Sequence, residues 1–221
     1  MHQYNFRAGH QMTVGRIIET LACVAEGAAW LSAQDPRFAD ALALTGPLPL
    51  RRKPDGFAQL LSAIVSQQVS VASANAIWNR LREAKLTGPR KILWASDEDL
   101  RAAGLSRQKI RYARALAEAR IDFKALRDVP TADVVTELTQ VSGIGIWTAE
   151  IYAMFSLGRA DVFAPGDLAL QESARLLFDL PERPKERALR DMAAAWSPWR
   201  SVAARLLWAY YHVAKDREGI R

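Results

Sequence analysis

Two glycines separated by one apolar residue, Gly143 and Gly145, interrupt two amphipathic segments and form a turn that could do chemistry. Glycine adopts positive φ without strain and lacks the Cβ atom that would keep a phosphate away from the backbone. The N–H groups of such a turn, with those that open the next helix, can converge on a phosphate oxygen. We expect Ile144 to anchor the turn in the core. A plain helix-to-helix connection with a glycine cap explains the same residues equally well.

A carboxylate, Asp167, stands at the start of a later helical segment, residues 168–178, directly after Pro165 and Gly166. This position predicts an N-cap, in which the side chain accepts hydrogen bonds from the first free N–H groups of the helix. The helix dipole favours the charged form, so we expect Asp167 to stay ionised at neutral pH. A fixed carboxylate can stabilise developing positive charge, although capping alone would explain the residue.

The elements that must position these groups are predicted to be helices. Every periodic segment has helical spacing and alternating strand patterns are missing, so we expect an all-α fold. Residues 57–65 carry one apolar stripe, and a second amphipathic helix follows at residues 71–81. The polar residues 66–70 between them predict a tight corner.

A second corner with basic neighbours is predicted around Gly104 and Ser106. Ser96 begins a short helix that Gly104 ends, and Ser106 caps the next helix. We expect the basic side chains of that helix to lie around its outside: Arg107, Lys109, Arg111 and Arg114. A further helix is predicted to start at Thr131, acting as a cap after a proline, and to reach Val141.

Composition narrows the class of protein. The 221 residues are 50% hydrophobic and 24% charged, as in globular proteins, and the net charge of +6 favours a polyanionic partner without identifying one. The single cysteine, Cys23, excludes an internal disulfide, a four-thiolate zinc site and an iron–sulfur cluster. No apolar run approaches the roughly 20 residues that span a bilayer, and the start resembles no signal sequence. We therefore expect a cytoplasmic protein that does not bind membranes.

Four segments resemble, in the same order, motifs of the helix-hairpin-helix DNA glycosylase superfamily, and within it the bacterial 3-methyladenine DNA glycosylase II branch. They are Ala-Ile-Val-Ser-Gln-Gln-Val-Ser at 63–70, Val-Ser-Gly-Ile-Gly-Ile-Trp-Thr-Ala at 141–149, Asp-Val-Phe-Ala-Pro-Gly-Asp at 161–167 and Trp-Ser-Pro-Trp-Arg-Ser at 196–201. The resemblance extends from about Asp35 to His212. Too few residues precede Asp35 for the β-rich domain of the best-known members, so the chain resembles the shorter, all-helical ones.

The resemblance implies the roles of several groups. Asp167 takes the place of the family's catalytic aspartate, which opposes positive charge on the deoxyribose as a purine N-glycosidic bond breaks. Asp161 is the competing carboxylate, and we interpret it as a loop or cap residue. The hairpin would hold the DNA backbone through Gly143, Ile144, Gly145, Ile146 and Thr148. Hairpin carbonyls often hold a monovalent cation in this superfamily, and no other cofactor or metal is implied.

Aromatic residues would form the pocket for an extruded base. Trp147 and Trp208 match pocket positions of the family, and Tyr152 is a candidate for its edge. A base made cationic by alkylation gains from an electron-rich indole face, whereas core packing is the alternative for each aromatic residue. Gln68 takes the place of the wedge that fills the base stack, where an apolar residue would be more usual. A polar helix corner explains Gln68 almost as well.

Trp147 also stands where superfamily members that cleave the DNA backbone carry a lysine that forms a Schiff base. The resemblance therefore implies a monofunctional enzyme that uses water. We expect a base excision repair glycosylase that removes alkylated purines such as 3-methyladenine from double-stranded DNA and acts as a monomer. The range over 3-methyladenine, 7-methylguanine, ethenoadenine and hypoxanthine stays open.

Two other functions compete. A non-catalytic helix-hairpin-helix DNA-binding module would need neither the aromatic pocket nor Asp167. A glycosylase of the iron–sulfur type is opposed by the lone Cys23.

The same resemblance predicts two helical lobes with a cleft between them. Residues 1–53 would pack with residues 161–221 as one lobe, and residues 54–160 would form the helix-hairpin-helix bundle. Prolines 47, 49 and 54 mark the non-helical link that follows a first helical segment, about residues 14–44. For residues 1–11 we expect disorder.

Overall fold

The computed structural model describes residues 14–217, and within them the chain forms twelve α-helices and two 3-10 helices, η1 (Ala125–Arg127) and η2 (Ala194–Trp196). Over the same range there is no strand beyond an isolated bridge between Ile17 and Arg159. The predicted all-α fold is confirmed. The expectation for residues 1–11 lies outside the described residues.

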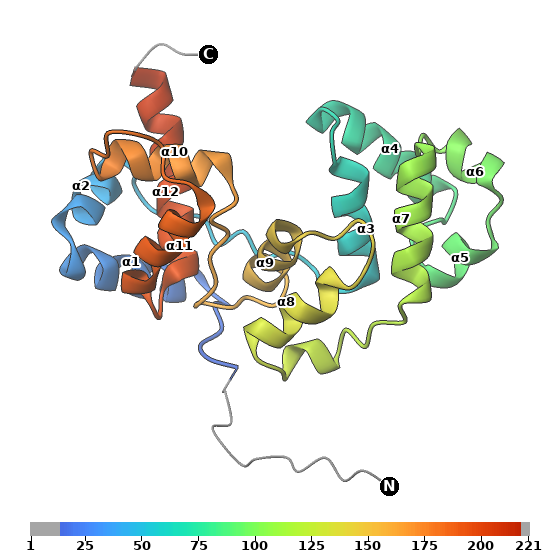
Figure 1. The fold of residues 1–221 in the computed structure, drawn as a ribbon, viewed down its shortest axis with the longest axis horizontal. Coiled ribbons are helices and arrows are strands. Elements are labelled where there is room, and N and C mark those ends of the chain that lie inside the picture. The colour runs from blue at the N-terminus through green and yellow to red at the C-terminus, as the bar shows by residue number, and fades with distance from the viewer. Residues whose placement is uncertain (1–13, 218–221) are drawn as a thin grey trace, which may run out of the picture.

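One group of helices gathers around the long helix α12 (Arg200–Arg217). Helices α1 (Leu21–Gln34) and α2 (Pro36–Thr45) pack on it and on each other, and α10 (Leu168–Leu177) packs on its other side. Helix α11 (Glu186–Ala193) lies against α10. Segments from the two ends of the described chain therefore share one core, at the left of Figure 1.

A second group lies on the opposite side of the molecule. It contains α3 (Phe57–Ser66), α4 (Val71–Glu83), α5 (Pro89–Trp94), α6 (Asp97–Ala102) and α7 (Arg107–Glu118). Helix α7 is its centre, because α3, α5 and α6 all pack against it. The apolar stripe predicted for residues 57–65 is buried, with Leu61 and Ile64 fully inaccessible.

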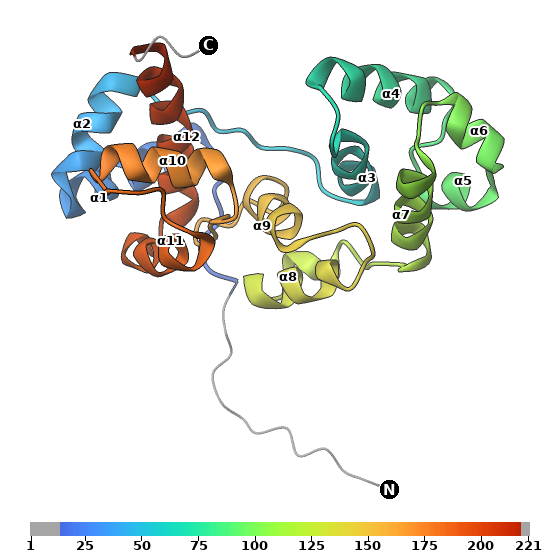
Figure 2. The same ribbon diagram turned by 45° about the horizontal axis from the view of Figure 1, so that its top comes forward.

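Two helices stand between these groups. Helices α8 (Thr131–Thr139) and α9 (Ile146–Phe155) pack together, and Figures 1 and 2 place them between the lobes. The turn between them contains Gly143 and Gly145. The turn lies against the second group of helices: Gly143 is close to Tyr112 of α7, and Ile144 is buried.

Several predicted helix boundaries are correct, and the predicted cap at Thr131 is wrong. Ser96 and Ser106 accept hydrogen bonds from Asp99 N and Lys109 N, as caps should. Thr131 is not a cap: it is the first residue of α8, Pro130 holds the N-cap position, and no side chain caps this end. The first helical segment consists of two helices, because Asp35 ends α1 and caps α2.

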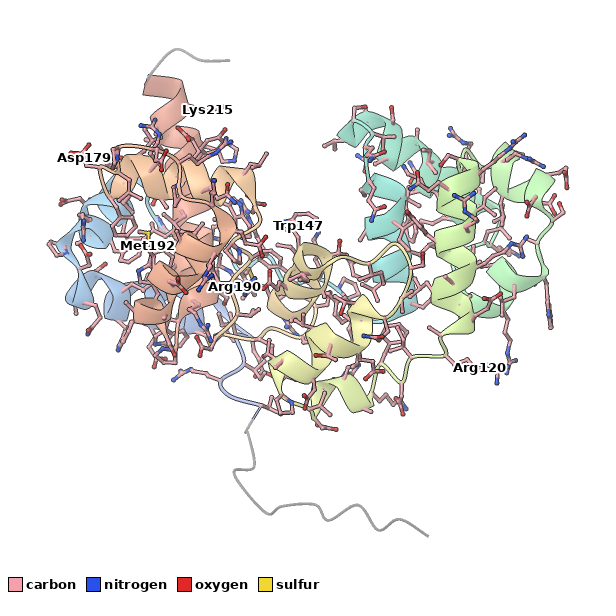
Figure 3. The ribbon with its side chains drawn as sticks, in the orientation of Figure 1. Arg120, Trp147, Asp179, Arg190, Met192 and Lys215 are labelled. Carbon is pink, nitrogen blue, oxygen red and sulfur yellow. The ribbon has the colours of Figure 1, made fainter. Side chains whose placement is uncertain are left out.

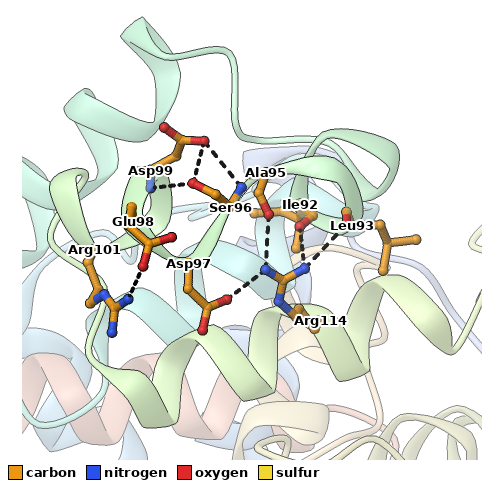
Figure 4. A network of polar contacts seen from close by, with 9 residues as sticks. All are labelled: Ile92, Leu93, Ala95, Ser96, Asp97, Glu98, Asp99, Arg101 and Arg114. Atoms are coloured by element: carbon orange, nitrogen blue, oxygen red, sulfur yellow. Dashed lines mark hydrogen bonds and ion pairs between the residues drawn. The ribbon is translucent and has the colours of Figure 1, made fainter.

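The expectation that the basic residues of α7 all lie outside is wrong for Lys109 and Arg114. Helix α7 packs against helices on several sides, so two of its basic side chains turn inward. Arg114 donates hydrogen bonds to the carbonyls of Leu93 and Ala95 and pairs with Asp97 (Figure 4). It thereby satisfies the free carbonyls at the end of α5 and joins α5 to α6.

No described helix is long and apolar enough to cross a membrane.

Candidate functional site

Asp167 is the point at which three helices converge. Its Oδ1 accepts hydrogen bonds from the N–H groups of Ala169 (2.9 Å) and Leu170 (3.1 Å), which confirms the predicted N-cap of α10. Two indole N–H groups also donate to it: Trp147 to Oδ2 at 3.1 Å and Trp208 to Oδ1 at 3.3 Å. Trp147 comes from α9 and Trp208 from α12. Residues that are 20 and 41 positions away in sequence thus meet at one carboxylate.

Two hydrogen bonds hold the turn that carries Asp167 in a fixed conformation. The backbone N–H of Asp167 donates to the carbonyl of Ala164 at 3.0 Å. The buried amide of Gln171 donates to the carbonyl of Pro165 at 2.8 Å. Because both bonds close the turn on itself and on α10, the carboxylate is presented at a fixed position.

The two indoles differ in exposure. Trp147 is 46% exposed at the start of α9, and Figure 3 shows it between the helices of the two lobes. Trp208 is half-buried and packs on Phe155, with ring centroids 5.8 Å apart. Trp147 therefore offers a ring face to a ligand, whereas Trp208 is braced by the core behind it.

Tyr152 does not join the two indoles at Asp167. It is buried, and its hydroxyl oxygen accepts a hydrogen bond from the N–H of Gly56 at 2.8 Å. Burial raises the pKa of Tyr152 to about 12. Together with Trp147, Thr148 and Ile151 it lines a cavity of about 160 Å³ between α3 and α9. Thr148 is buried as well and lines the same cavity.

The two glycines of the hairpin serve different purposes. Gly143 has φ +93°, and a Cβ atom there would lie 2.3 Å from Cγ of Tyr112, so both conformation and packing require glycine. Gly145 has an extended backbone, and a Cβ there would meet nothing within 4 Å. Ile144 is buried, as predicted, and Ile146 is exposed. The hairpin is thus anchored at Gly143 and Ile144 and open at Gly145.

The predicted wedge corner lies next to the hairpin. Gln68 is exposed between α3 and α4 with φ +56°, a conformation that non-glycine residues rarely adopt. The neighbouring Gln67 donates its amide to the carbonyl of Gly143 at 2.9 Å. Both glutamines and both hairpin glycines line one cavity of about 590 Å³.

The competing carboxylate, Asp161, has structural partners. Its oxygens accept hydrogen bonds from Ser197 (2.9 Å) and Arg200 (2.5 Å). It therefore ties the loop after α9 to the start of α12, away from the two indoles that meet Asp167.

An ion pair that no local sequence pattern indicates joins α9 to α11, and only its acidic member is buried. Glu150 of α9 is almost fully buried and accepts a hydrogen bond from Arg190 of α11 at 2.8 Å. Burial raises the pKa of Glu150, and Arg190 partly opposes that shift. Arg190, labelled in Figure 3, also binds Glu186, whose carboxylate lies beside Gly166. Through Arg190 and Glu186, the pair connects α9 to the turn that precedes Asp167.

Among residues 14–217, no three His, Cys, Asp or Glu side chains are grouped in a way that could hold a metal ion.

Residues 61–199 match the family model described as HhH-GPD superfamily base excision DNA repair protein. A curated Schizosaccharomyces pombe protein named DNA-3-methyladenine glycosylase 1 is 32% identical over 178 residues, which cover 76% of this chain and 78% of the relative.

Solved structures agree with that match. The crystal structure of DNA-3-methyladenine glycosidase from Bacillus halodurans has a TM-score of 0.78 and 35% identity, over 91% of this chain and 94% of that one. A Schizosaccharomyces pombe 3-methyladenine DNA glycosylase in complex with abasic DNA has a TM-score of 0.73 and 31% identity, over 83% and 95% of the two chains.

Proposed function

The chain belongs to the HhH-GPD superfamily of base excision DNA repair proteins, and on this premise we propose that it is a monofunctional DNA glycosylase of the 3-methyladenine glycosylase II type. It hydrolyses the N-glycosidic bond of alkylated purines, such as 3-methyladenine, in duplex DNA. The observation that carries this proposal is the Asp167 carboxylate, on which two indoles and a helix N-terminus converge.

The reaction needs a fixed negative charge more than a strong base. When the bond breaks, its electron pair leaves with the purine, and positive charge develops on C1′ and O4′ of the deoxyribose. Three N–H donors occupy Oδ1 of Asp167 and hold the carboxylate in place. Among the described residues only Trp147 donates to Oδ2, so one lone pair remains to face the sugar or to orient the attacking water. Asp167 therefore acts mainly by electrostatic stabilisation.

This mode of action suits alkylated purines. Alkylation at N3 or N7 gives the base a positive charge, so it leaves without first being protonated by an enzymatic acid. The exposed ring of Trp147 offers a stacking surface for such a base, and a cation over an indole face is stabilised by about 0.5–2 kcal/mol. Trp208 holds the other side of the carboxylate. Recognition and leaving-group chemistry thus favour the same class of base.

The hairpin holds the DNA backbone beside this site. Gly145 begins α9 without a side-chain cap, so the first N–H groups of the helix are free for a phosphate oxygen. Within the described part of the chain, the carbonyls of Val141 and Gly143 each accept one hydrogen bond, and a carbonyl oxygen has two lone pairs. These carbonyls suit a monovalent cation, which when bound would add positive charge next to the phosphate.

A base-release assay tests the glycosylase function. Duplex DNA treated with dimethyl sulfate is incubated with the protein, and the released purines are separated and quantified. Asp167→Asn is expected to lower excision by about a hundredfold or more, because removal of one electrostatic group from such a site has effects of that size. Asp40→Asn removes an exposed carboxylate of the same lobe and should leave the rate unchanged. Equal binding of damaged and undamaged duplex without base release would support a non-catalytic DNA-binding module instead.

Borohydride trapping tests the monofunctional mechanism. With Trp147 after the hairpin in place of a lysine, no Schiff base with the sugar is expected. The product should be an intact strand with an abasic site, and borohydride should leave no protein on the DNA. A covalent adduct on a denaturing gel would contradict the mechanism.

A further inference from the structure

Lys109 is a buried cation whose partner is a helix end rather than a carboxylate. Its side chain comes from α7 and is 8% exposed. The ammonium donates to the carbonyl of Val65 at 2.6 Å. Burial lowers the pKa of Lys109, with no acidic group opposing the shift. A methionine would fill a similar volume without this desolvation, so the ammonium contributes chiefly the bond that it makes.

The carbonyl that it binds lies in the last turn of α3, immediately before the corner at Gln67 and Gln68. Carbonyls in the last turn of a helix lack partners within the helix, and a cation at that end also opposes the helix dipole. Lys109 therefore binds one of the free carbonyls at the C-terminal end of α3. Gln67 continues the connection, because its amide binds the carbonyl of Gly143. Lys109, both glutamines and the hairpin glycines line the same cavity of about 590 Å³.

We propose that Lys109 is a positioning residue for base extrusion: its ammonium holds the end of α3, and so keeps the exposed Gln68 corner in a fixed position against the hairpin. The inference rests on the proposed glycosylase function and adds to it the residue that stiffens the wedge. A rigid corner is needed while the base is paired and stacked, because the protein must then supply the free energy of opening. A base that has no partner needs much less.

The test compares two duplexes that carry one 7-methylguanine, paired with cytosine or placed opposite an abasic-site analogue. Lys109→Met is expected to slow single-turnover excision from the paired duplex by about tenfold, the effect of losing one hydrogen bond from a charged group. Excision from the unpaired duplex should stay close to that of the wild type. Arg111→Met is the matched control, because it removes an exposed cation from the same helix. Lys109→Arg keeps a cationic donor and should restore most of the rate.

A second readout does not depend on hydrolysis. A 2-aminopurine placed beside the paired 7-methylguanine becomes more fluorescent when its neighbour leaves the stack, and Lys109→Met should reduce this rise. Lys109→Gln is the second loss variant if the methionine variant does not fold, since its shorter amide stops short of the Val65 carbonyl. Equal loss of excision on both duplexes, or an unchanged fluorescence rise, would overturn the inference. A wild type that changes the fluorescence but releases no base would instead overturn the proposed function, and the fluorescence of Lys109→Met would still decide the role of Lys109.

Discussion

Helices α9 and α10 begin close to each other, yet their N-termini are finished in opposite ways. Gly145 precedes α9, and no side chain caps this helix. Asp167 precedes α10, and its carboxylate accepts two of the helix N–H groups. Both ends carry the same partial positive charge. One is left open to an anion from outside, and the other is closed by an anion of the chain itself.

This difference separates the two tasks that we propose for the site. An open N-terminus attracts any phosphate and reads no sequence, so it suits a grip on the DNA backbone. At the closed N-terminus the helix N–H groups bind one carboxylate and fix its position. Such a carboxylate suits chemistry at a single sugar. Trp147 connects the two, because it lies in the first turn of α9 and donates to Asp167.

The largest effect is expected from a substitution that caps the open N-terminus of α9. In Gly145→Asp the extended backbone and the empty space around the position accept the new side chain. The carboxylate should cap α9 and repel the phosphate, so duplex affinity should fall by about a hundredfold. Thermal stability should stay the same or rise slightly. Fluorescence anisotropy with a labelled duplex measures the affinity, and calorimetry measures the stability.

Gly145→Ala is the matched control, because it adds a Cβ atom without charge or cap. Its affinity should fall much less than that of Gly145→Asp, while Asp167→Asn should bind duplex DNA nearly as the wild type does. If Gly145→Asp bound DNA normally, the phosphate grip would lie elsewhere on the molecule.

The two helix N-termini could be predicted from the sequence, but the contact between them could not. The cap at Asp167 and the turn at Gly143 could be inferred because both are local: a residue type at a helix boundary, and two glycines in a turn. The hydrogen bonds from Trp147 and Trp208 depend on how α9, α10 and α12 pack, which no local pattern encodes. For the same reason Lys109 was placed on the outside of its helix and is buried.

Tyr152 shows a different limit of prediction from sequence. It lies a little more than one helical turn after Trp147, and this spacing makes it a candidate for the edge of the pocket. Its hydroxyl oxygen accepts a hydrogen bond from the N–H of Gly56, 96 residues earlier in the chain. Proximity along one helix could not reveal this long-range partner.

At the N-terminus of α10, removal of one hydrogen-bond donor should make the Asp167 carboxylate less firmly fixed. Trp208→Phe keeps a ring against Phe155 but loses the N–H that binds Oδ1 of Asp167. Excision of 7-methylguanine should slow by about tenfold at saturating protein, because a hydrogen bond to a charged group is lost and the carboxylate gains freedom. DNA affinity should change little. Trp94→Phe, at an exposed indole on α5, is the control and should leave the rate unaltered; a similar loss in both variants would argue against the role of Trp208.

The smallest effect concerns the ion pair between Glu150 of α9 and Arg190 of α11. The pKa of Glu150 is raised above its ordinary value of 4.5, mainly by burial. The folded state therefore binds this proton more tightly than the unfolded state does, so the contribution of Glu150 to stability is greatest below about pH 4.5 and declines as the pH rises through the raised value. Glu150→Gln does not titrate and should lack this decline. Calorimetry of both proteins across that range should show the wild type losing stability relative to the variant as the pH increases. A wild type that instead gained stability relative to the variant would mean that the bond to Arg190 outweighs the desolvation of Glu150. The attraction between the two charges would then stabilise the contact between α9 and α11.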